Sequence, residues 1–166
     1  MNERLHRLLL KVFGVLPRRL RRLLVRLGSP KYTVGAICIV QRGDGAVLLV
    51  RHSYYRRWGT PGGLAKRHER PEVAVVRETR EEVNLLVELI GEPVVVVEPV
   101  PHRVDVVFLA RPAEGISLDQ VRPSSPEIEQ LEWFALDALP NLQDETVTAM
   151  RALERSGLLD LADANL

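Results

Sequence analysis

Cysteine is almost absent from this chain of 166 residues, which contains only Cys38. A single cysteine excludes an intrachain disulfide, so no disulfide framework supports the fold. The chain also lacks any run of the roughly 18 apolar residues that a membrane-spanning helix needs. Cys38 lies in the strand-like stretch YTVGAICIV, where we expect it to pack as a small hydrophobe. These absences favour a reducing, cytoplasmic setting.

What the chain does contain is typical of a globular protein, with 46% hydrophobic and 27% charged residues. The length suits one domain with an added element. The net charge of +1 hides an asymmetry, because residues 1–31 hold nine basic side chains and one acid, which gives +8. The remainder holds fourteen basic and twenty-one acidic side chains, which gives −7. We therefore predict a basic extension over residues 1–30 and an acidic domain over residues 31–166.

The basic extension has the periodicity of two short amphipathic helices. Apolar residues recur at helical spacing in each segment, and Pro17 is well placed at the start of the second helix. Gly28, Ser29 and Pro30 end the extension. The two apolar stripes consist of Leu5, Leu8, Leu9, Val12 and Phe13, and of Leu20, Leu23, Leu24 and Leu27.

Several functions remain open for the extension. A secretory signal is disfavoured because Lys11 interrupts the apolar run and no small-residue cleavage site follows, whereas an organelle-targeting peptide fits the composition. The helices can pack on the domain or on a second subunit. Alternatively, residues 1–28 contact a membrane surface or a nucleic acid. The scarcity of aromatic residues for base stacking weakens the nucleic-acid interpretation.

The domain has the pattern of an α/β (α+β) fold. Strand-like runs cover residues 32–40 and 46–52, and the Asp44-Gly45 pair between them is a hairpin signal. Hairpins combined with two helices predict a sandwich that contains a mixed β-sheet. The remaining predicted elements are a helix at 71–83, strands at 94–98 and 104–110, a loop at 111–126, a strand at 130–136 and a helix at 143–156.

Three glutamates crowd the predicted helix at 71–83. Glu78, Glu81 and Glu82 are spaced i, i+3 and i+4, so they are neighbours on the helix surface and repel one another. A run of glutamates is usually a solvated helix face. A divalent cation between them would turn the repulsion into attraction, because hard cations prefer oxygen ligands. The surrounding residues decide between these interpretations.

The segment from Gly63 to Leu85 resembles the Nudix box, G-x5-E-x7-R-E-U-x-E-E-x-G-U, in which U is a bulky aliphatic residue. The chance of all six fixed positions matching in one window is roughly 10⁻⁷ at average composition. Two positions depart from the pattern. Thr79 replaces an aliphatic residue, although its methyl group can face the core, and Asn84 replaces a glycine where a left-handed conformation is expected. The matching residues are Gly63, Glu69, Arg77, Glu78, Glu81 and Glu82.

The resemblance implies a Nudix-type α/β/α sandwich and an enzyme that hydrolyses a pyrophosphate bond in a nucleoside diphosphate linked to another moiety. It implies Mg²⁺ as the cofactor, with Mn²⁺ as a substitute, and a homodimer. By the family's pattern, Glu78 and Glu82 are metal ligands, and Glu81 is a ligand or the general base. Arg77 orients the glutamates, Glu69 holds Arg77, and Gly63 is structural. The Gly62 carbonyl is a further expected ligand.

Residues outside the box are weaker candidates. The resemblance implies that a base or a ligand also comes from a later loop, for which Glu127 is our first choice and Glu129 the second. A polar loop role for Glu127 is equally consistent with the sequence. Arginine binds phosphate in a bidentate manner, so basic residues near the box are candidates for substrate contacts. These candidates are Arg51, His52, Arg57, His102 and Arg103.

Two alternative functions remain at this stage. The domain can be a non-catalytic Nudix-like sensor that binds a nucleotide, although its intact set of glutamates argues against that role. It can also act on RNA 5′ ends through the basic helices, and a scaffold role led by those helices is a third option. The substrate is not determined by the box, because specificity resides in other loops and strands.

Overall fold

The chain divides into two units, residues 1–31 and residues 32–166. The computed structural model describes residues 3–162 and 164–166. In the first helix the side chains of Arg4, Leu5, Leu8 and Leu9 lie outside that description. The apolar stripe predicted for this helix can therefore be followed only at Val12 and Phe13.

The first unit consists of helices α1 (Glu3–Val15) and α2 (Arg18–Gly28). Pro17 occupies the cap position before α2, and its carbonyl accepts the N–H of Leu20 at 2.9 Å. The helix ends where the Ser29 N–H bonds the Val25 carbonyl, as the Gly-Ser-Pro sequence predicts. Across the described residues, no helix combines the length and the apolar character that crossing a membrane requires.

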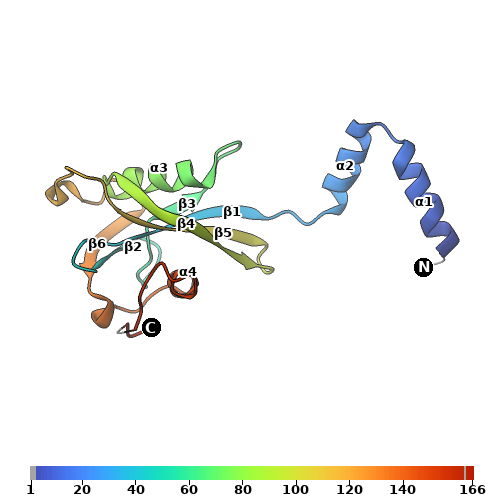
Figure 1. Cartoon of the computed structure of the whole chain (residues 1–166). Coiled ribbons are helices and arrows are strands. Elements are labelled where there is room, and N and C mark those ends of the chain that lie inside the picture. Colours follow the sequence, from blue (N-terminus) through green and yellow to red (C-terminus); the bar gives the residue numbers. More distant parts are fainter. Residues whose placement is uncertain (1–2, 163) are drawn as a thin grey trace. The chain divides into compact units, whose positions relative to one another are not determined.

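The second unit holds a mixed four-stranded sheet with the order β3-β1-β5-β4 and a separate antiparallel pair, β2-β6. Helices α3 and α4 lie on opposite sides of the four-stranded sheet (Figure 1). The elements are β1 (Thr33–Val40), β2 (Val47–His52), β3 (Gly62–Leu64), α3 (Pro71–Val83), β4 (Val87–Glu98), β5 (Arg103–Pro112), η1 (Leu118–Gln120), β6 (Ile128–Phe134), η2 (Leu136–Ala138) and α4 (Asp144–Arg155).

Strand β1 organises the sheet. It pairs in parallel with β5, from Thr33 opposite Arg103 to Val40 opposite Ala110. Its other edge pairs antiparallel with β3, where Ala36 faces Gly63. Parallel pairing buries both faces of a strand, which explains the nearly continuous apolar sequence of β1.

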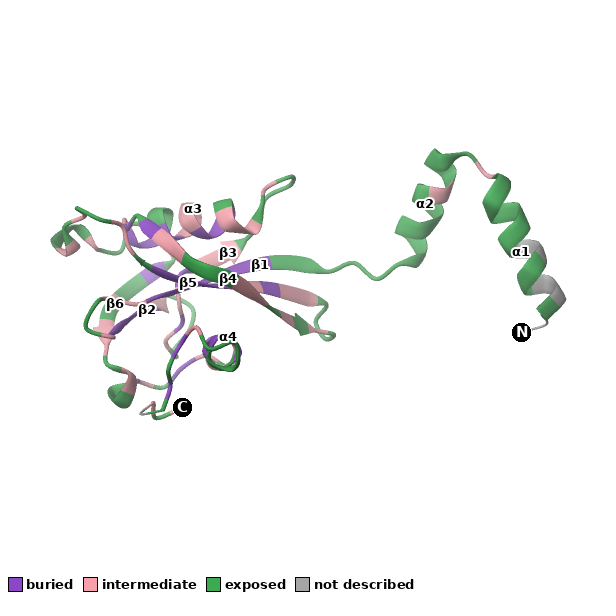
Figure 2. Ribbon diagram, in the orientation of Figure 1, coloured by how far each residue is buried: buried purple, intermediate pink, exposed green. Residues whose placement is uncertain are grey.

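Side chains alternate between the two faces of each strand, and this produces two hydrophobic cores, one beneath α3 and one beneath α4. Figure 2 shows buried residues along β1 and on the inward faces of α3 and α4. Cys38 is fully buried in the core beneath α3, as the sequence predicts. That core includes Ala36, Cys38, Val40, Leu48, Val75, Val83 and Phe108. The core beneath α4 includes Ile37, Ile39, Leu49, Val107, Leu109, Met150 and Leu153. The predicted α/β/α sandwich with a mixed sheet is therefore confirmed.

Three details differ from the sequence prediction. The turn at Asp44-Gly45 forms, but its strands pair only at Gln41 and Val47 because β1 and β2 then enter different sheets. Strand β4 begins at Val87 rather than at residue 94, because an irregularity between Ile90 and Val94 lets pairing continue across Gly91. The prediction assigned no strand to Gly62–Leu64, which is too short to show a periodicity.

Adjacent leucines provide a matched test of this core. Leu85 is completely buried, whereas Leu86 is 38% exposed. We expect Leu85→Ala to lower the free energy of unfolding by about 2–5 kcal/mol, because the substitution leaves a cavity. Leu86→Ala should cost about 1 kcal/mol or less. Denaturant unfolding of both variants checks the difference, and equal losses would contradict the described packing.

Candidate functional site

Helix α3 presents the crowded glutamates while its other face enters the core. It starts at Pro71 and ends at Val83, and Asn84 after it has φ of 54° and ψ of 36°, the left-handed conformation expected there. Thr79 is completely buried and donates its hydroxyl to the Val75 carbonyl at 2.8 Å. Arg70 caps the helix without a side-chain bond, as its residue type predicts. The buried face therefore fixes which residues point away from the core.

The Arg77 guanidinium connects the loop before α3 to the glutamates of the helix. Its Nε and Nη2 donate to the two carboxylate oxygens of Glu69, each at 2.8 Å. Its Nη1 donates to Glu78 at 2.7 Å and to Glu81 at 3.1 Å. The Lys66 backbone N–H also donates to Glu69, at 2.7 Å. This bidentate geometry holds the loop, the arginine and two glutamates in one arrangement.

The ionisation of the Arg77–Glu69 pair follows from these bonds. Hydrogen bonds from Arg77 and from the Lys66 backbone lower the pKa of Glu69 from 4.5 to about 2. The hydrogen bond to Glu69, with smaller contributions from Glu78 and Glu81, raises the pKa of Arg77. Both groups are therefore charged at neutral pH, and the tie between loop and helix is an ion pair.

Glu82 is the buried member of the cluster. Only 7% of its surface is exposed, and its Oε2 accepts the Gly62 backbone N–H at 3.1 Å. Burial raises its pKa from 4.5 to about 8 against the opposing effect of that hydrogen bond. The negative charges of Glu78, Glu127 and Glu81 act in the same direction as burial and are part of this shift. Four carboxylates thus surround a region with an excess of negative charge.

Two adjacent glycines bring β3 close to the cluster. Gly62 has a φ of 152°, and a Cβ placed there would overlap the Ala36 backbone carbonyl. A Cβ on Gly63 would approach the Glu78 carboxyl carbon to 2.6 Å. The absence of side chains at these positions lets β3 pair with β1 and leaves room for the Glu78 carboxylate.

The donor set suits a hard divalent cation, because it consists of carboxylate oxygens. The present side-chain arrangement is not a finished metal site. Within residues 3–162 and 164–166, no group of three or more His, Cys, Asp or Glu side chains is arranged to hold an ion. Arg77 Nη1 engages one oxygen each of Glu78 and Glu81, which leaves the second oxygen of each carboxylate for an ion. The predicted ligands Glu78, Glu81, Glu82 and the Gly62 carbonyl stay predictions.

The two candidate glutamates of the later loop have different surroundings. Glu127 precedes β6, its backbone carbonyl accepts the Ser53 N–H at 2.9 Å, and its charge raises the pKa of Glu82. Glu129 instead forms an ion pair with Arg51, at 3.3 Å between Oε2 and Nη2. The structure therefore brings Glu127, and not Glu129, toward the carboxylate cluster.

The end of β2 and the loop after it supply further polar groups near Glu127. Among the described side chains, the buried Arg51 Nε and His52 Nδ1 lack hydrogen-bond partners. Burial lowers the pKa of His52, and the charge of Glu127 opposes this effect. A hollow of about 540 Å³ lies in this region. Its lining consists of Arg51, Ser53, Tyr54, Tyr55, Arg56 and Glu129.

Sequence reasoning did not place Tyr54 in the site. Burial raises its pKa first, followed by the charges of Glu127, Tyr55 and Glu82, so its hydroxyl lies near the carboxylates. Its ring centroid is 4.9 Å from that of Tyr55 and 5.3 Å from that of His52. Two consecutive tyrosines shortly after a strand are a sequence feature that could have pointed to this loop. The sequence does not show, however, whether the loop turns toward the glutamates or away from them.

The other predicted substrate contacts are engaged elsewhere. Arg57 pairs with Asp144 at the start of α4, with 2.6 Å between Nη1 and Oδ1. Arg103 donates its Nε to the buried Asp105 at 2.7 Å. His102 packs edge-on against the Tyr32 ring, with 5.3 Å between the centroids. These contacts stabilise the ends of the sheet and of α4, and the structure does not bring the three residues to the glutamates.

The Glu69–Arg77 ion pair predicts an acid-sensitive contribution to stability. The folded-state pKa of Glu69 lies below its ordinary value, so its contribution is complete above pH 4.5 and is lost as the pH falls toward about 2. We expect the unfolding free energy of Glu69→Gln to depend less on pH in this window. Denaturant unfolding across the window checks this, with Glu154→Gln on exposed α4 as the control. Parallel pH profiles for Glu69→Gln and the original chain would contradict the assignment.

Comparison with known proteins adds independent information. Residues 31–155 match the NUDIX domain. The chain is 36% identical over 137 residues to a protein of Pseudomonas aeruginosa named NAD-capped RNA hydrolase NudC, which covers 80% of this chain. The chain spans only 44% of that relative's length. It is also 30% identical over 125 residues to a MutT-like protein of Streptomyces ambofaciens, covering 75% of this chain and 77% of the relative.

A solved structure supports the same assignment. The MutT NUDIX hydrolase from Burkholderia pseudomallei superposes with a TM-score of 0.61 and 31% identity. The match covers 75% of this chain and 99% of the other. The NUDIX match includes the whole second unit up to the end of α4, and with it the Arg77-centred glutamate cluster. The chain therefore belongs to the Nudix hydrolase family.

Proposed function

We propose that this protein is a divalent-metal-dependent hydrolase of a pyrophosphate bond in a nucleoside diphosphate linked to another moiety. The observation that carries the proposal is the buried Glu82 among Glu78, Glu81 and Glu127, with Arg77 tied to Glu69 beside them. Like charges gathered around a buried carboxylate destabilise the fold unless a cation or a proton neutralises them. A site of this kind is suited to binding a cation.

The names of the relatives guide the choice of substrate class. The Pseudomonas relative is named for the hydrolysis of NAD-capped RNA, in which a pyrophosphate joins two nucleosides. The Streptomyces relative is named only as MutT-like. The chain spans less than half of the Pseudomonas protein, so residues that select that protein's complete substrate can lie outside the matched part. We therefore carry over only the chemical class of the bond that is cleaved, a pyrophosphate linkage. We therefore propose nucleoside diphosphate derivatives as the class.

The proposed roles follow from the positions of the side chains. Glu78 and Glu82 hold the metal ion, Mg²⁺ or Mn²⁺, with Glu81 and the Gly62 carbonyl as further ligands. A bound divalent cation would neutralise phosphate oxygens and lower the pKa of a bound water molecule. Arg77 positions Glu78 and Glu81 through its Nη1, and Glu69 fixes the orientation of the guanidinium. Glu69 thus acts through Arg77 and does not touch the substrate.

Glu127 is the proposed general base. It approaches the cluster from a loop outside α3, so its carboxylate is free of the Arg77 network, and its charge acts on both Glu82 and Tyr54. A base in this position accepts the proton that water loses as it attacks phosphorus. Arg51, with its buried Nε, and His52 lie on the adjacent strand end and are the proposed contacts for the substrate's phosphates.

A nucleotide sensor without catalysis is the alternative. That function needs a binding surface but no general base and no set of carboxylates around a buried glutamate. The retention of all these groups favours hydrolysis. A panel with Mg²⁺ or Mn²⁺ tests the choice, using NAD, ADP-ribose, nucleotide sugars, nucleoside triphosphates, and capped or triphosphorylated RNA. Tight binding without any product across the panel would favour the sensor.

The first substitution test concerns Glu82. We expect Glu82→Gln to lower kcat/KM for the best substrate by about 10²-fold or more, because loss of a direct ligand should cost at least as much as loss of an outer-shell partner. The amide oxygen can still accept the Gly62 N–H, so thermal unfolding should show a retained fold. Glu154→Gln, on the exposed face of α4, is the matched control. Full activity in Glu82→Gln would refute the ligand assignment.

The second substitution test separates the base from its neighbour. Glu127→Gln should lower kcat by about 10²–10⁴-fold, the range typical of general bases, while metal affinity measured by calorimetry stays unchanged. Glu129→Gln carries the same change two residues away, on a side chain that pairs with Arg51. It should retain most of the activity. An equal loss in the two variants would exclude Glu127 as the base.

A further inference from the structure

The first unit exposes an unusual amount of apolar surface for so short a segment. In α2 the exposed fractions are 40% for Leu20, 51% for Leu23, 45% for Leu24 and 73% for Leu27. At helical spacing these leucines fall within an arc of about 100° on one side of the helix. No residue of α2 is buried. Within the described part of the first unit, the leucine stripe of α2 is therefore exposed along its length.

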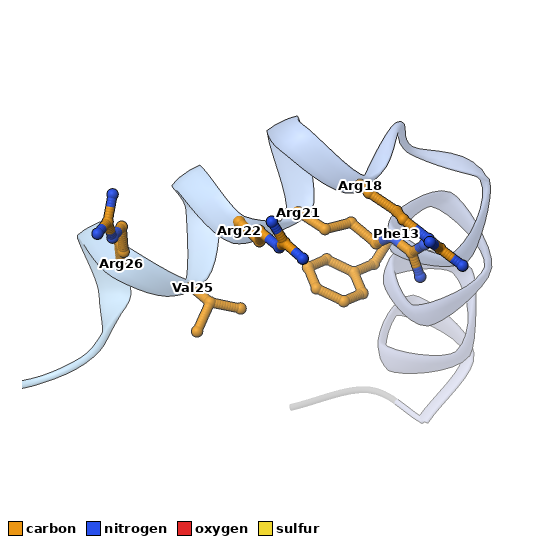
Figure 3. A pocket seen from close by; sticks show the side chains of 6 residues that line it. All are labelled: Phe13, Arg18, Arg21, Arg22, Val25 and Arg26. Atoms are coloured by element: carbon orange, nitrogen blue, oxygen red, sulfur yellow. The ribbon is translucent and has the colours of Figure 1, made fainter.

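The opposite arc of α2 carries the positive charge and faces α1. A hollow of about 590 Å³ lies between the two helices. Figure 3 shows Phe13 of α1 pointing toward the arginines of α2. The hollow is lined by Phe13, Arg18, Arg21, Arg22, Val25 and Arg26. The hollow thus lies on the arginine arc, on the side of α2 away from the leucine stripe.

The charge of this unit limits what can cover the stripe. Residues 1–31 contain nine basic side chains and one acid, and α2 itself contains five arginines and no acid. A second copy of the same helix would bring together two strongly positive segments, which repel one another. A suitable partner must offer negative charge directly beside an apolar phase. An anionic lipid surface has that layered composition.

We propose that helices α1 and α2 bind the surface of an anionic membrane. The leucine stripe enters the boundary between headgroups and acyl chains. Arg19 and Arg21 lie at the edges of the stripe on the helical wheel, and their long side chains reach the lipid phosphates. With 11 residues, α2 lies in the plane of the membrane surface and is far too short to cross it.

The leucine stripe also explains why a lipid surface is favoured over RNA. Binding to RNA phosphates would use the arginines but leave four exposed leucines in water. The described part of the unit offers Phe13 as its single aromatic side chain, so base stacking has little support. An anionic membrane surface, by contrast, contacts the leucines through its acyl chains and the arginines through its phosphates.

Flotation of the full-length chain with vesicles tests this proposal. We expect binding to vesicles of phosphatidylcholine and phosphatidylglycerol in equal parts, and little binding to phosphatidylcholine alone. Leu23→Gln with Leu24→Gln should weaken binding by about tenfold or more, because glutamine preserves helix propensity but removes the apolar face. Arg19→Gln with Arg21→Gln should weaken binding similarly and reduce its sensitivity to salt.

A matched control removes two arginines from the second unit. Arg151 and Arg155 are exposed residues of α4, so Arg151→Gln with Arg155→Gln should leave vesicle binding unchanged. Equal weakening in this control would overturn the proposal in favour of a general charge effect. Vesicle binding that is insensitive to the leucine substitutions would also overturn it.

Two further outcomes identify other partners for the extension. The proposal fails if the chain binds single-stranded RNA but not anionic vesicles, and if only the arginine substitutions weaken that binding. It also fails if sedimentation shows a dimer that the leucine substitutions dissociate while vesicles remain unbound. Hydrolysis by the second unit is measured separately, so neither outcome bears on the proposed activity.

Discussion

The contact on which the site depends is the bidentate ion pair between Arg77 and Glu69. It joins a loop to a helix across eight residues of sequence and leaves one guanidinium nitrogen free for Glu78 and Glu81. One cation therefore balances three carboxylates. This sharing leaves a local excess of negative charge, which adds to burial in raising the pKa of Glu82. The cluster is held together and at the same time remains short of positive charge.

The sheet and the core beneath α3 hold the carboxylates of this cluster in place. Strand β1 pairs with β3 through two glycines, and one of them donates its backbone N–H to Glu82. A side chain at Gly63 would displace the Glu78 carboxylate, so the backbone of β3 forms one wall of the cluster. Helix α3 supplies the other wall, because Thr79 and Val83 fix its rotation against the core. The stability of an ordinary core thus holds together charges that repel one another.

The two units distribute charge in opposite ways. In the second unit, the exposed arginines of β5 and of the loop before β3 pair with nearby acids, as in Arg111 with Glu88 and Arg57 with Asp144. In α2, five arginines share a helix that contains no acid. Unpaired positive charge and exposed leucines both raise the free energy of a unit left alone in water, and both are relieved by an anionic surface with an apolar interior.

The sequence by itself determined the α/β/α sandwich, the limits of α3, the left-handed Asn84 and the contact between Glu69 and Arg77. The limits of α3 follow from local periodicity, whereas the sandwich and the Glu69–Arg77 contact follow from the resemblance to the Nudix box. It did not determine the separation of β1 from β2, the position of β3, or the choice between Glu127 and Glu129. It also suggested substrate roles for Arg57 and Arg103, which stay predictions; in the fold these residues pair with Asp144 and Asp105. Only tertiary structure decides strand order and loop position, because they depend on contacts between distant segments and on how loops leave the sheet.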